Sequence, residues 1–87
     1  MLVILVYDVN EKRVAKALRT CRRYLHWVQN SVFEGEITKA RLEALRQDLK
    51  KVLDLKVDSV LIYKIRTTKY FKREILGKER QEISQFL

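Results

Sequence analysis

The sequence predicts one α+β domain in which two helices cover one face of an antiparallel sheet, and three features of the 87-residue chain predict it. An apolar, β-branched run opens the chain. Two later segments repeat apolar residues at three-and-four spacing, and strand-like segments stand between and after them. The resulting order of strand, helix, strand pair, helix and strand is the βαββαβ plan of a ferredoxin-like sandwich.

Residues 2–9 are predicted to form a central strand, because large apolar side chains occupy both of its alternating faces. We therefore expect both faces of this strand to be covered. Asn10 is predicted to cap a helix that begins at Glu11. The apolar stripe that packs this helix on the sheet consists of Val14, Ala17, Leu18, Cys21 and Leu25.

The segment 26–37, HWVQNSVFEGEI, has strand-like content. A tight turn at Asn30 and Ser31 would split it into two short paired strands, and one bent strand is the alternative. Thr38 is predicted to cap a second helix that ends near Asp54. The apolar stripe of that helix consists of Leu42, Leu45, Leu49, Val52 and Leu53.

A further clear strand is predicted at 59–65, SVLIYKI, and the segment 68–76, TKYFKREIL, would form an extra C-terminal strand before a turn at Gly77. A sandwich this small leaves one face of its sheet without helices. The tail also ends in apolar residues, namely Ile83, Phe86 and Leu87. We therefore expect a two-fold homodimer in which the sheets of two protomers face each other.

Composition indicates a single domain over residues 1–87, with no linker, repeat or low-complexity segment. No run approaches the ~18 apolar residues of a membrane span, and the first residues lack the features of a signal peptide. We expect a cytoplasmic protein that has no membrane partner. The single cysteine, Cys21, has no second cysteine for a disulfide and no ligand set for zinc.

Basic residues are unevenly distributed in this chain, which has a net charge of +8. Lys12, Lys16, Arg19 and Arg23 fall on one stripe of the first predicted helix, and seven more basic residues lie in 64–80. Both regions are candidate surfaces for the phosphates of RNA or DNA. Ordinary solvated helix faces are the alternative. Because no aromatic-rich motif for base stacking is present, we expect contacts to the nucleic-acid backbone.

Asp8 is the candidate catalytic and metal-binding residue, because a buried strand rarely ends on a carboxylate. The alternative is that Asp8 caps the first helix, but Asn10 is better placed for that role. One carboxylate is too little for tight Mg²⁺ binding, whereas a two-fold axis would supply two. An ion held between them would orient a water molecule and neutralise charge on a phosphodiester.

Other polar and aromatic residues receive structural interpretations. Asp58 is a weaker candidate for a second acid, and we favour a role in a turn. His26, a lone histidine at a helix-to-strand junction, is more typical of a surface or capping residue than of a general base. The remaining expectations are packing or dimer contact for Tyr7, a turn for Ser31, the core for Phe33 and a structural role for Tyr63.

Three blocks, VYDVN, VQNSVFEGEI and DSVLIYKI, give the chain a resemblance to a known family. In order and spacing they resemble the small CRISPR-associated protein family Cas two. The resemblance implies a ferredoxin-like homodimer with a metal-binding aspartate at the end of its first strand, which is Asp8 here. It also implies Mg²⁺-dependent endonuclease cleavage of RNA or DNA during CRISPR adaptation.

The same resemblance implies a second, non-catalytic role. Members of the family bridge two dimers of the CRISPR integrase subunit and hold protospacer DNA, and this bridging does not need the aspartate in every member. The sequence thus favours a metal-dependent nuclease and keeps a DNA-bridging scaffold as the alternative. A toxin-like ribonuclease that acts alone is a third hypothesis.

Overall fold

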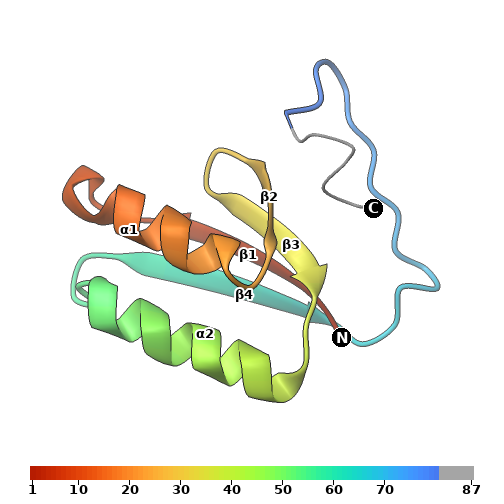
Figure 1. Cartoon of the computed structure of the whole chain (residues 1–87). Helices are drawn as coiled ribbons and strands as arrows, with labels where there is room; N and C mark the ends of the chain where they lie inside the picture. The colour runs from red at the N-terminus through yellow and green to blue at the C-terminus, as the bar shows by residue number, and fades with distance from the viewer. Residues whose placement is uncertain (81–87) are drawn as a thin grey trace.

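The computed structural model describes residues 1–80 and contains four strands and two helices within them (Figure 1). In chain order these are β1 (Leu2–Asp8), α1 (Glu11–Arg22), β2 (His26–Gln29), β3 (Val32–Glu36), α2 (Lys39–Val52) and β4 (Ser59–Ile65). This order confirms the predicted α+β, βαββαβ arrangement. No helix of the described residues is long and apolar enough to cross a membrane.

The four strands form one antiparallel sheet in the order β2-β3-β1-β4, so β1 is central as predicted. Leu5 of β1 lies between Phe33 of β3 and Ile62 of β4. Both helices lie on the same face of the sheet (Figure 1). We call this the helix face, and the opposite side of the sheet the open face.

The hydrophobic core lies between the helix face and the two helices. Alternate residues of β1 point into it, so Val3, Leu5 and Tyr7 are buried. The other members of the core are Ala17, Cys21, Leu25, Phe33, Ile37, Leu42, Leu45 and Leu49. Leu18, Val52 and Leu53 of the predicted stripes are partly buried against this core. Val14 of the first predicted stripe is 38% exposed instead, because the buried side of α1 is centred on Ala17, Thr20 and Cys21.

The open face is not covered by any other element of regular structure among the described residues. Leu2, Ile4 and Val6 of β1 are half-buried there, while Leu61 and Tyr63 of β4 are 53% and 55% exposed. The expectation that both faces of the first strand are covered therefore fails within one chain. A second layer over the open face would be needed to fulfil it.

The residues predicted to cap the helices and to turn the chain do so in the structure. The Asn10 side chain accepts a hydrogen bond from the Lys12 amide at 3.0 Å, and that of Thr38 accepts one from the Arg41 amide at 3.2 Å. The segment 26–37 is a hairpin rather than one bent strand. Asn30 turns it with a positive φ of 44°, a conformation that asparagine tolerates better than most residues.

The predicted extra C-terminal strand is not formed within residues 66–80. This segment leaves β4 and passes over the open face, where Arg73 pairs with Glu34 of β3 at 3.5 Å. Its backbone makes a local hydrogen bond, from the Phe71 amide to the Thr68 carbonyl at 3.0 Å, and within the described residues it forms no ladder with the sheet. The apolar residues Ile83, Phe86 and Leu87 lie outside the described residues.

Candidate functional site

Asp8 is the last residue of β1 and lies on the open face. It follows Val6 on that side of the alternating strand, whereas Tyr7 points into the core. Its partner in the β1–β4 ladder is Ser59, the first residue of β4. Asp8 is exposed, and its carboxylate makes no hydrogen bond or ion pair with the other residues of 1–80. Since Asn10 caps α1, Asp8 is not used for capping.

Asp58 is close to Asp8 in the sheet but has a different environment. Its side chain is fully buried and accepts two hydrogen bonds from the Arg13 guanidinium, at 2.6 and 3.0 Å. The Arg13 contact, together with the amides of Asn10 and Asp54, holds the pKa of the Asp58 carboxyl far below its usual range. Asp58 therefore holds a turn, as favoured, and is not available as a second acid.

Within residues 1–80, one chain does not provide a set of metal ligands. Among residues 1–80, no three His, Cys, Asp or Glu side chains are grouped so that they could hold an ion. Mg²⁺ is commonly held by one or two carboxylates together with water and substrate phosphate. The unpaired Asp8 carboxylate fits as one such ligand, and a second copy of the chain would supply another.

The predicted basic stripe is exposed along α1. Lys12, Lys16 and Arg19 extend into solvent, and Arg23, just after the helix, pairs with Asp48 of α2 at 3.1 Å. Lys16, Arg19 and Arg23 also line a shallow hollow beside Val52. Because α1 covers the helix face, the stripe and Asp8 lie on opposite sides of the sheet. The structure does not bring them together into one site within a chain.

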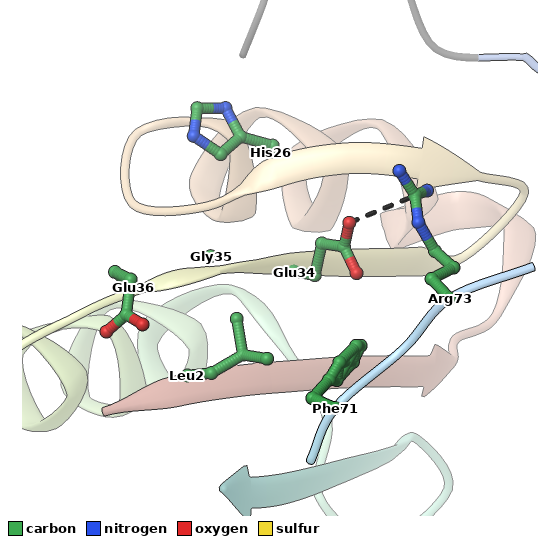
Figure 2. A pocket seen from close by; sticks show the side chains of 7 residues that line it. All are labelled: Leu2, His26, Glu34, Gly35, Glu36, Phe71 and Arg73. Atoms are coloured by element: carbon green, nitrogen blue, oxygen red, sulfur yellow. Dashed lines mark ion pairs between the residues drawn. The ribbon is translucent and has the colours of Figure 1, made fainter. Parts of the chain in front are cut away.

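A pocket at the opposite end of β1 from Asp8 was not predicted from the sequence. Figure 2 shows its lining, which consists of Leu2, His26, Glu34, Gly35, Glu36, Phe71 and Arg73. His26 is exposed at the start of β2 and is paired in register with Glu34. A regular turn at 30–31 would pair His26 with Gly35, and the irregularity between Trp27 and Gln29 shifts its partner to Glu34. His26 is far from Asp8 for two reasons. Its partner Glu34 pairs with Ile4, which lies four residues, or about 13 Å, along β1 from Asp8, and β3 lies between β2 and β1.

Cys21, Tyr7 and Phe33 belong to the core. Burial raises the pKa of the Cys21 thiol to about 12, so the thiolate needed for nucleophilic attack or metal binding is disfavoured. Tyr7 packs against Phe33 with 6.0 Å between the ring centroids, which confirms a packing role for both.

Comparison with known proteins identifies the family. The family model described as "CRISPR associated protein Cas2" matches residues 1–73. The chain belongs to the Cas2 family. The matched region contains all six helices and strands together with Asp8 and Asp58. It ends within the segment 66–80 that follows β4.

Named relatives of this Cas2 chain are similar over all or nearly all of their length. The CRISPR-associated endoribonuclease Cas2 of Dictyoglomus turgidum is 51% identical over 87 residues, which is 100% of each chain. That of Thermotoga maritima is 51% identical over 82 residues, or 94% of each chain. The protein of the same name from Pyrococcus furiosus is 46% identical over 87 residues, again 100% of each.

Solved Cas2 structures have the same fold. A crystal structure described as Cas2 superposes with a TM-score of 0.84 at 43% identity, covering 95% of this chain and 93% of that one. Cas2 of Streptococcus pyogenes, solved at pH 6.5, gives a TM-score of 0.78 at 34% identity, covering 88% of this chain and 100% of that one. Fold and family predicted from the sequence are both confirmed.

Proposed function

We propose that this Cas2 chain is a CRISPR adaptation subunit with metal-dependent endonuclease activity on the phosphodiesters of RNA or DNA. The observation that carries the proposal is the Asp8 carboxylate, which is exposed at the end of a central strand and has no partner in residues 1–80. The relatives named as endoribonucleases support the reaction type.

The proposed site is completed by a second protomer. The open face carries half-buried Leu2, Ile4 and Val6 beside the exposed Leu61 and Tyr63, an apolar surface that a second copy would cover. A two-fold axis places the same residue on both sides of the interface. With the axis close to the end of β1, the Asp8 residues of two protomers would face one cleft.

Each chain would contribute the carboxylate oxygens of Asp8, which are accessible to solvent at the end of β1. Mg²⁺ bound there would neutralise phosphate charge and favour attack by water. Asp8 would hold the ion, and its exposed position admits the phosphodiester. Within one chain His26 is too far from Asp8 for proton transfer at this site, because it lies two strands away and level with Ile4.

Cleavage assays test the proposal through Asp8→Asn. Labelled single-stranded RNA and duplex DNA are incubated with and without Mg²⁺, at equal concentrations of folded dimer. We expect cleavage by the wild type to need Mg²⁺ and to fall by about 10²- to 10³-fold in the variant, the loss expected when several kcal/mol of charge stabilisation is removed. Activity that is unchanged in Asp8→Asn, or independent of Mg²⁺, would contradict the proposal.

A second candidate function is a non-catalytic scaffold that bridges integrase dimers and binds protospacer duplex DNA. The observation that favours it is the separation of the basic stripe on α1 from Asp8 by the thickness of the sheet. Binding to such a stripe needs no carboxylate. In that case Asp8→Asn would still bind duplex DNA and still bridge the integrase.

A further inference from the structure

Asp58 is a buried carboxylate that joins three segments at the Asp8 end of the sheet. Its Oδ1 accepts hydrogen bonds from the Asn10 amide and from Arg13 Nη2, both at 3.0 Å. Its Oδ2 accepts them from Arg13 Nε at 2.6 Å and from the Asp54 amide at 2.9 Å. Each oxygen therefore has two donors, and the bidentate Arg13 contact neutralises the buried charge.

These hydrogen bonds hold the backbone that follows Asp8 and the start of the neighbouring strand β4. Asn10 follows Asp8 by two residues, so its amide fixes the path of the backbone as it leaves β1. Ser59 is the ladder partner of Asp8 and comes directly after Asp58. Arg13 ties the same carboxylate to the first turn of α1. Figure 1 shows that the starts of α1 and β4 lie at this one end of the sheet.

We infer that Asp58 and Arg13 are positioning residues for Asp8: they hold the end of β1 so that its carboxylate stays directed from the open face toward a metal ion. This inference rests on the proposed function of Asp8. Asp58 does not touch the ion, because its own oxygens are fully used by Arg13 and the two amides. Asp58 acts on Asp8 through two short backbone segments. One follows Asp8 in the chain and contains Asn10, and the other is the start of β4 beside it.

The isosteric variant Asp58→Asn tests this inference. The NH₂ group of the asparagine would replace one of the two carboxylate oxygens. In either orientation it would face two N–H donors, so the side chain must move away from them. The readout is the affinity for Mn²⁺, measured by electron paramagnetic resonance of the free ion on dimeric protein whose folding is checked by circular dichroism. We expect the affinity to fall by about tenfold or more, the usual effect of losing a residue that orients a metal ligand.

Asp48→Asn is the matched control. Asp48 also links two segments, since it accepts hydrogen bonds from Arg23 and Tyr24. It lies near the far end of α1, a helix of 12 residues that is about 18 Å long. If Asp58 mattered only for stability, Asp58→Asn and Asp48→Asn should change the affinity for Mn²⁺ by the same amount. We expect Asp48→Asn to leave the affinity for Mn²⁺ unchanged.

Arg13→Lys provides a milder variant if Asp58→Asn does not fold. Lysine keeps the positive charge but cannot donate to both carboxylate oxygens in the fork geometry of arginine. We expect Mn²⁺ affinity between those of the wild type and Asp58→Asn. Wild-type affinity in Arg13→Lys would overturn the inference when Asp58→Asn cannot be measured.

Asp8→Asn separates the failure of this inference from the failure of the proposed function. If Asp8→Asn binds Mn²⁺ as tightly as the wild type, the metal site is elsewhere, and both the proposed function and the inference fail. If Asp8→Asn loses binding while Asp58→Asn retains wild-type affinity, the proposed function stands and the positioning role alone is overturned.

Discussion

Two aspartates only one strand apart differ in what surrounds them. Asp8 is exposed and unpaired among the described residues, whereas Asp58 is enclosed by Arg13 and two backbone amides. A free carboxylate at a surface can accept a metal or a phosphate-bound ion, whereas a saturated one can only hold the neighbouring segments in place. The chemistry of this end of the sheet is therefore divided between the two residues.

The pH dependence of stability follows from the lowered pKa of Asp58. The carboxylate is favoured in the folded state by Arg13 first and by the two amides next. Its contribution is full above the unfolded pKa of about 3.9 and is lost as the pH falls toward the folded pKa, which lies lower. We expect the difference in free energy of unfolding between wild type and Asp58→Asn to be constant above about pH 5 and to shrink below about pH 4.

Urea titrations of both proteins at several pH values measure this difference. A gap that stays constant down to about pH 2 would show that the Asp58 charge adds nothing to stability in this range.

Sequence reasoning placed Asp8 at the end of the first strand and found the Asn10 cap, because both depend on neighbours within a few residues. It did not find the partners of Asp58, since Arg13 and Asn10 are 45 and 48 positions away along the chain. It also omitted Thr20 from the buried side of α1. Thr20 can be buried because its hydroxyl donates to the Lys16 carbonyl at 2.8 Å, a hydrogen bond with no apolar signature.

At the scale of elements, α1 has two chemically different sides. Its buried side packs on the sheet through Ala17 and Cys21, and its outer side presents Lys12, Lys16 and Arg19. Helix periodicity predicted this division, and local signals predicted both helix caps and the hairpin turn. The extra strand in 66–80 could not be predicted reliably, because a strand forms only by pairing with another strand, and local sequence does not determine that long-range contact.

The outer side of α1 is tested by reversing charges at Lys12, Lys16 and Arg19 to Glu. If these residues bind phosphates, affinity for duplex DNA should fall. The slope of log K against log salt concentration should also decrease by about one for each phosphate that the variant no longer neutralises. Arg23 is left unchanged, because its reversal would break the ion pair with Asp48.

The matched control for this change reverses Lys39, Lys50 and Lys56, three exposed lysines outside the stripe, and so alters the net charge of the chain by the same amount. Equal reductions of affinity in both triple variants would indicate a general charge effect and would contradict a specific role for the stripe.

At the scale of the whole molecule, the single chain has two layers, a sheet and a pair of helices, and within residues 1–80 no helix covers the open face of the sheet. The helices complete one face of the sheet, while the open face keeps Leu61 and Tyr63 exposed and carries the unpaired Asp8 at its rim. Within the described residues, one protomer thus has both an apolar surface and an unpaired carboxylate on the same face of the sheet. A second protomer over the open face would account for both features.

The stoichiometry of Mn²⁺ bound to the dimer tests this account most directly. Titration of the wild-type protein, followed by electron paramagnetic resonance, should give one tightly bound ion for every two chains, and Asp8→Asn should bind none tightly. One ion per chain, or tight binding that survives in Asp8→Asn, would contradict a metal site shared between two Asp8 residues.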